Sequence, residues 1–151
     1  MNRSLGLALL TLAFVLGALA TAGDGASVAS DRMKTIGFGK PVDLTPHITK
    51  GKVTIVDFYS DYCGPCVLIG ALLEQALAKE DTVRLVRVNV NRPGVKGIDF
   101  RSPLARQYRL TRLPSFLIYT DEGKLVKQDD DAYDAVISWL EHHGLWPPKE
   151  R

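Results

Sequence analysis

Cysteine and histidine are scarce in this chain, whose 151 residues include two cysteines and three histidines. A framework of several disulfides is therefore excluded. A structural zinc site needs four ligands, so Cys63 and Cys66 could complete one only with His47, His142 or His143. His142 and His143 end a predicted helix, where a favourable interaction with the helix dipole accounts for them. Three roles therefore remain open for the two cysteines: a structural disulfide, part of a metal site, or a redox-active pair.

An excess of charge is also missing. The 19 basic residues nearly balance the 17 acidic ones, aromatic residues make up 8% of the chain, and no run of basic residues occurs. This composition argues against a nucleic-acid partner. Arginines nevertheless gather in the middle of the chain, where we expect them to lie on solvated faces: Arg84, Arg87, Arg92, Arg101, Arg106, Arg109 and Arg112.

A long apolar run occurs at the N-terminus, from Leu5 to Ala20. Arg3 precedes it and Ala20-Thr21-Ala22 follows, which is the pattern of a secretory signal, and the run is shorter than the roughly 20 residues that cross a membrane. We predict a cleaved signal at residues 1–22 and a periplasmic or secreted protein; an uncleaved membrane anchor and a buried core helix are the alternatives. We further predict a flexible lead-in (23–34), one domain (35–146) and a tail (147–151).

Strand and helix patterns alternate through the domain. Strands are predicted at 52–60 and 82–90, with a helix at 66–79 between them. Ser102 and Pro103 predict the start of a short helix to about residue 108, and a hairpin follows at 115–128. Asp129–Asp131 are expected to cap a last helix over 132–143, which Gly144 ends. This order predicts an α/β fold with a central mixed β-sheet flanked by helices.

The spacing of the cysteines favours exchange over stapling. A disulfide between Cys63 and Cys66 would close a loop so short that its entropic stabilisation is only roughly 2 kcal/mol. Cys63 instead lies between a strand and the start of a helix, where free N–H groups and the helix dipole favour the nucleophilic thiolate. Pro65 is compatible with the first helical turn, because no N–H is needed there.

The stretch VTIVDFYSDYCGPC resembles the strand and active site of the thioredoxin family, and RLPSFLIY resembles that family's segment around a cis-proline. The resemblance covers roughly residues 35 to 143 and implies a thioredoxin-like three-layer fold. It implies that Cys63 is the exposed attacking thiolate, that Cys66 is the buried resolving thiol, and that Pro114 is the cis-proline, which places the backbone of Leu113 where a substrate strand can pair with it.

The resemblance also implies that Asp57 is a buried acid that relays a proton, with Arg87 in the place of a partner lysine. From the residues alone, Asp57 is unusual, since burying an unpaired carboxylate within an apolar strand is costly. The alternatives are an acid that faces water from an edge strand and, for Arg87, a simply exposed arginine.

Three departures from the family pattern alter the predicted substrate groove, which Tyr62, Gly64, Pro65, Leu113 and Pro114 would line. Tyr62 stands where the family has tryptophan. The loop over 92–104 is longer than the family's, and its Phe100 is expected to pack under the loop; the alternative is that the loop presents Phe100 to a partner. The glycine-containing stretch before the last helix is absent, because Gln128 leads directly into Asp129–Asp131.

We therefore predict an exported thiol:disulfide oxidoreductase that acts on protein thiols and disulfides without a bound cofactor or metal. Gly64-Pro65 offers no charge to stabilise a thiolate, so a reductant fed by a membrane electron donor is favoured over an oxidant. We expect a monomer. The alternatives are a binding module with an inert disulfide and a metal-handling protein.

Overall fold

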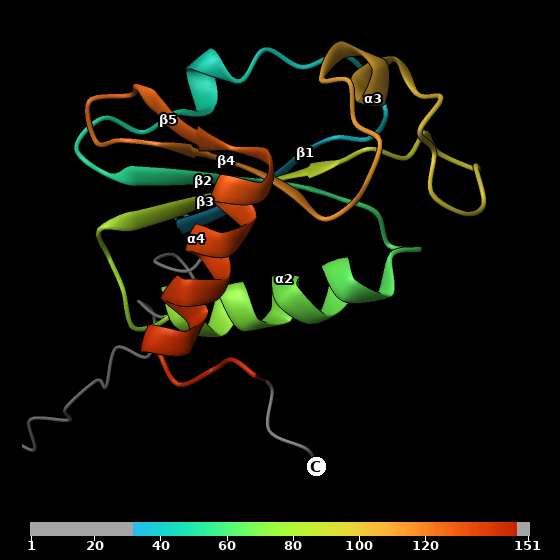
Figure 1. Cartoon of the computed structure of the whole chain (residues 1–151). Helices are drawn as coiled ribbons and strands as arrows, with labels where there is room; N and C mark the ends of the chain where they lie inside the picture. The colour runs from blue at the N-terminus through green and yellow to red at the C-terminus, as the bar shows by residue number, and fades with distance from the viewer. Residues whose placement is uncertain (1–31, 148–151) are drawn as a thin grey trace, which may run out of the picture.

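Five strands form one mixed sheet in the computed structural model, which describes residues 32–147 (Figure 1). The order across the sheet is β1-β3-β2-β4-β5. The first three strands in this order run parallel and the last two run antiparallel to their neighbours. Their bounds are β1 Met33–Gly37, β2 Val53–Tyr59, β3 Val83–Asn89, β4 Ser115–Tyr119 and β5 Leu125–Gln128.

Helices cover both faces of the sheet. Figure 1 shows α2 (Gly64–Leu77) and α4 (Asp129–His142) on one face, with α3 (Pro103–Gln107) and the 3₁₀ turn η1 (Thr45–His47) on the other. The three predicted layers are therefore present. Among residues 32–147, no helix is both long and apolar enough to cross a membrane. The predicted signal at residues 1–22 lies outside the described residues, as does nearly all of the predicted tail.

The central strand β2 has apolar side chains on both faces because helices and loops bury it from both sides. Ile55 points into the core that α2 and α4 share with the sheet. Val56 and Phe58 belong to a second core, which Leu104 of α3 completes on the opposite face. In this strand only Asp57 is charged, and its position fixes it on the same face as Ile55, beneath α2.

Most predicted elements are confirmed within one to three residues of their ends, including the Ser102 cap, whose hydroxyl accepts a hydrogen bond from the N–H of Ala105. The prediction that Asp129–Asp131 precede the last helix is wrong, because α4 begins at Asp129 and Gln128 is its N-cap residue. Strand β1 was not predicted; it begins at Met33, inside the stretch expected to be a lead-in.

Candidate active site

Cys63 and Cys66 form a disulfide at the start of α2, with their Cα atoms 5.2 Å apart. Strand β2 ends at Tyr59, a short turn follows, and Cys63 is the N-cap residue of the helix. The Sγ of Cys63 accepts a hydrogen bond from the backbone N–H of Cys66 at 3.2 Å. The free N–H groups at the helix N-terminus point toward a sulfur in this position. Together with the helix dipole, they stabilise its thiolate once the pair is reduced.

The disulfide is enclosed by its neighbours. Tyr59 forms a buried cluster with the two cysteines, Leu113 packs against this cluster, and only 4% of Cys63 and 1% of Cys66 are exposed. Cys63 is therefore buried in the disulfide state, and its exposure in the reduced pair stays a prediction. Tyr62, by contrast, is 54% exposed and extends the surface beside the pair.

A groove of about 310 Å³ begins beside the disulfide at Pro65. The Leu113–Pro114 peptide bond, which is cis, forms part of its wall. Because β4 begins only at Ser115, Leu113 lies just before the sheet ladder. The groove is lined by Pro65, Arg112, Leu113, Pro114, Ser115, Asp129, Asp130 and Tyr133. Its far wall is thus acidic where the family pattern has glycine, and Arg112 forms an ion pair with Asp130 across it.

Asp57 is buried beneath α2, as the resemblance implied, with 1% of the residue exposed. Its Oδ2 accepts a hydrogen bond from Nε of Arg87 at 3.0 Å, while its Oδ1 is buried with no hydrogen-bond partner among the described residues. Burial raises the pKa of Asp57 to about 6, and the positive charge of Arg87 only partly opposes this. The alternative of an acid facing water is therefore excluded.

Besides Asp57, two neighbours hold the Arg87 guanidinium in place. Its Cζ lies 4.0 Å from the centre of the Tyr59 ring, a cation–π contact, and its Nη1 lies 3.7 Å from a carboxylate oxygen of Glu74. Gly70 of α2 makes room for it, because a Cβ there would lie 2.4 Å from Nη2 of Arg87. The alternative of a simply exposed arginine is wrong, since the side chain is 13% exposed.

Sequence reasoning missed Tyr59, Gly70 and Asn89. A lone glycine inside a helix was the available signal, since it often marks close packing. Asn89 of β3 donates a hydrogen bond from Nδ2 to Oδ2 of Asp61 at 3.0 Å. The carboxylate of Asp61, two residues before Cys63, is thereby held by the end of β3.

The expectation that Phe100 packs under its loop is wrong. Phe100 is 36% exposed, because the loop buries the neighbouring Asp99 in its place. Within residues 32–147, no three histidine, cysteine or acidic side chains gather as a metal ion would require.

Comparisons with known proteins agree with this geometry. The Thioredoxin family model matches residues 43–142. A thioredoxin-like protein of Fusarium culmorum is 33% identical over 93 residues, which are 60% of this chain and 69% of that protein. A thioredoxin of Coprinus comatus is 28% identical over 75 residues, 50% of this chain and 65% of that protein. With two further thioredoxins, the matched stretch is 40% and 56% of the relative's length.

A solved structure with the same fold is thioredoxin f2 of Chlamydomonas reinhardtii, with a TM-score of 0.50 and 27% identity over 78% of this chain and 99% of that one. The family model spans well over half of the sequence and includes the disulfide, Asp57 and Pro114. The chain therefore belongs to the thioredoxin family.

Proposed function

We propose that this chain is a thiol:disulfide oxidoreductase that exchanges disulfides with partner proteins through Cys63 and Cys66. The observation that carries the proposal is the disulfide at the N-terminus of α2, together with a buried carboxyl group beneath the same helix whose pKa is raised to about 6. A merely structural staple would need neither the helix terminus nor the buried acid.

In the first step, the Cys63 thiolate of the reduced pair attacks one sulfur of a substrate disulfide. A mixed disulfide forms, and the other substrate sulfur leaves as a thiolate that takes up a proton. The extended substrate segment lies in the groove beside Pro65, with its backbone next to that of Leu113.

The second step needs Cys66 as a thiolate. The buried carboxylate of Asp57 accepts the proton of the Cys66 thiol, and the new thiolate attacks Sγ of Cys63. This releases the second substrate thiolate and leaves the Cys63–Cys66 disulfide, so two electrons have passed to the substrate. A pKa of about 6 suits a base that works near neutral pH, and a dithiol donor must then restore the reduced pair.

Electrons flow outward in this proposal, from the protein to its substrates, outside the cytoplasm. The N-terminal signal pattern supports export, and a membrane donor would supply the electrons there. Gly64-Pro65 adds no charge beside the sulfurs, and Asn89 fixes the negative Asp61 nearby, so the thiolate lacks the extra support that a strong oxidant needs. One neighbour of the same fold was solved as thioredoxin f2 in complex with ferredoxin:thioredoxin reductase, which illustrates a reductase as donor.

Trapping of partners tests the exchange. The variant Cys66→Ser should accumulate covalent complexes through Cys63, because the resolving step is lost, whereas Cys63→Ser should trap almost none. Dithiothreitol should cleave the mixed disulfides, so the complexes should disappear from a reducing gel. Equal trapping by the two variants would contradict the assigned order of attack, and the absence of complexes together with no reduction of insulin would refute the exchange itself.

The direction is tested separately by equilibrating the purified protein with glutathione buffers. We expect a potential close to the roughly −270 mV of thioredoxin. A pair that stays mostly reduced in a buffer as oxidising as the secretory space would make the protein a disulfide donor instead.

A further inference from the structure

Two segments at the carboxyl ends of β1 and β3 form a surface that the exchange steps do not use. They are the 37–40 turn and the loop from 91 to 102. The N–H of Leu104, just after the loop, donates a hydrogen bond to the carbonyl of Gly39 at 3.2 Å. A Cβ on Gly39 would lie 2.6 Å from the backbone N of Arg92, so the two segments are in direct contact. We call their exposed part the loop surface: Phe38, Lys40, Lys96, Ile98, Phe100 and Arg101.

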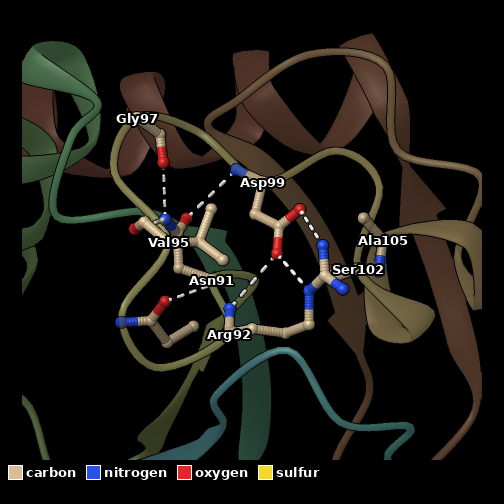
Figure 2. Close-up of polar contacts among 8 residues, drawn as sticks. Asn91, Arg92, Val95, Gly97, Asp99, Ser102 and Ala105 are labelled. Carbon is tan, nitrogen blue, oxygen red and sulfur yellow. Dashed lines mark hydrogen bonds and ion pairs between the residues drawn. The ribbon is translucent and has the colours of Figure 1, made fainter.

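Polar contacts inside the loop fix its shape (Figure 2). The side chain of Asn91 donates to the carbonyls of Val95 and Gly97 and accepts a hydrogen bond from the N–H of Asp99. The carboxylate of Asp99, 4% exposed, receives two hydrogen bonds from the Arg92 guanidinium at 2.7 and 3.1 Å. The loop is therefore pre-organised, which lowers the entropic cost of binding a partner.

This ordered framework holds apolar side chains out of the core. Phe38 is 48% exposed, Ile98 is 37% exposed and Phe100 is 36% exposed. Phe38 also has a φ of 52°, a left-handed conformation that is rare for a bulky residue and that often marks functional segments. Large apolar side chains exposed on two ordered segments in contact are typical of a binding site for another protein.

The loop and the stretch that follows it are rich in positive charge. Residues 92–112 contain a single acid, Asp99, which is paired with Arg92. Among residues 32–147, no carboxylate forms an ion pair with Lys40, Lys96 or Arg101, and all three are exposed. The same stretch contains six basic residues: Arg92, Lys96, Arg101, Arg106, Arg109 and Arg112.

The loop surface is connected to the turn that leads to the disulfide. The N–H of Val90 donates to the carbonyl of Tyr59 at 3.0 Å, and the side chain of Asn89 bonds Asp61. Asn89 also accepts a hydrogen bond from the N–H of Asn91, the first residue of the loop. A protein bound to the loop therefore lies within reach of Cys63.

We propose that the loop surface is a docking site for a protein whose contact face is acidic and carries an apolar side chain. This rests on the proposed function, because the docked protein would be a substrate or donor in disulfide exchange. Complementary charge speeds encounter and selects among partners, and the exposed phenyl and isoleucine groups supply the apolar contact. The exposed apolar side chains favour a protein over a nucleic acid, and the connection to the turn that carries the disulfide favours a protein over a membrane, which has no disulfide to exchange.

The proposal is tested on the full chain with two disulfide peptides. The acidic peptide has four glutamates flanking the disulfide, and the neutral peptide has glutamines in their place. We expect KM for the acidic peptide to be lower by about tenfold, the low end of electrostatic steering, with kcat unchanged. Added salt should remove the difference. The double variant Lys96→Glu/Arg101→Glu should abolish it, and Phe100→Ser should raise KM for both peptides.

Matched controls lie on β5, at the opposite edge of the sheet, where Lys127 and Val126 are exposed. Lys127→Glu and Val126→Ser should change neither KM. Binding of the acidic peptide with its cysteines replaced by serine, followed by fluorescence anisotropy, gives a readout that needs no exchange.

Equal KM and equal binding for the two peptides would overturn the docking site while leaving the exchange intact. Tighter binding to phosphatidylserine vesicles or to a DNA duplex than to the acidic peptide would also overturn it. Preferential binding of the acidic peptide, lost in the double variant, without reduction of either peptide would support the docking site and refute the proposed function.

Discussion

Two aspartate–arginine pairs in this protein have opposite properties, although both carboxylates are buried. In the pair of Asp57 and Arg87, one hydrogen bond of 3.0 Å reaches Oδ2, Oδ1 has no partner within the described chain, and burial raises the pKa to about 6. In the pair of Asp99 and Arg92, both oxygens accept from the guanidinium, and these hydrogen bonds lower the pKa of Asp99.

Solvent exposure alone does not distinguish the two carboxylates, since Asp57 is 1% exposed and Asp99 is 4% exposed. Their surroundings do: desolvation beneath α2 has the largest effect on Asp57, whereas hydrogen bonds from Arg92 have the largest effect on Asp99, which lies in a surface loop. Asp99 also receives the backbone N–H of Arg92 at 3.4 Å, whereas Asp57 depends on one side chain. Asp99 is therefore held as an anion that orders a loop, whereas Asp57 can gain or lose a proton near neutral pH.

The largest difference is expected when each cation is removed. Arg87→Met leaves the Asp57 charge buried without a partner and should lower the free energy of unfolding at pH 7 by about 3–5 kcal/mol. Arg92→Met should cost clearly less, because the Arg92 side chain is 48% exposed and water and backbone N–H groups can still solvate Asp99. Urea denaturation measures both variants, with circular dichroism as the control for folding. Equal losses would remove the distinction between the pairs.

The pH dependence of stability should have opposite signs in the two pairs. The folded pKa of Asp57 exceeds its unfolded value of 3.8, so the folded chain holds a proton that the unfolded chain has released. Stability should fall as pH rises from about 4 to about 6, by up to about 3 kcal/mol for a shift of this size. Asp57→Asn should remove this slope.

Asp99 provides the contrast, because its folded pKa is lowered. Its contribution to stability is present above about pH 4 and is lost as pH falls through its folded pKa. Asp99→Asn should therefore be destabilising at pH 7 and nearly neutral in strong acid. Parallel curves for the wild type and Asp57→Asn would contradict the raised pKa.

Exchange should distinguish the same two acids. Asp57→Asn should slow the reduction of a small neutral disulfide at pH 7 on the order of a hundredfold, the low end of general acid–base catalysis, because Cys66 loses its base. Asp99→Asn should stay within about twofold of the wild type, since a small neutral substrate does not need the loop. Stopped-flow measurement under single-turnover conditions isolates this step. A similar rate for Asp57→Asn would exclude the relay.

The smallest effect is expected from a single methyl group. Gly70→Ala places a Cβ 2.4 Å from Nη2 of Arg87, and the contacts of Arg87 with Asp57 and Tyr59 limit its retreat. The variant should lose about 1–2 kcal/mol, typical of overpacking, and the pKa of Asp57 should rise further. Gly64→Ala, in the same helix with nothing within 4 Å of the added Cβ, is the matched control. Equal stability of the two variants would show that Arg87 is free to move.

The features predicted from the sequence are those with a local signal. Strand β2, the start of α2 and the Ser102 cap each depend on residues close together in the chain. The pairing of Asp57 with Arg87 was implied by the family resemblance and not by spacing, since 30 residues separate them.

Other features depend on tertiary contacts that no local pattern encodes. Strand β1 is short and has no fully buried residue, and its place beside β3 follows from pairing in the register 33↔85 to 37↔89. Asp129 takes a left-handed φ of 53° at the entry to α4, where the sequence suggested a cap. Phe100 was expected inside because it is apolar, but the internal hydrogen bonds of Asp99 decide which side chain the loop buries.

The positions of the two tryptophans have a spectroscopic consequence. Trp139 and Trp146 pack against the core between the sheet and helices α2 and α4, whereas the aromatic residue that packs with the disulfide is a tyrosine, Tyr59. Quenching of indole emission by a disulfide requires close contact, so reduction of Cys63–Cys66 should leave the tryptophan fluorescence nearly unchanged. Unfolding should change it strongly. Tryptophan emission can therefore follow folding at any redox state, and tyrosine-sensitive or thiol-labelling signals are needed to follow the redox state itself.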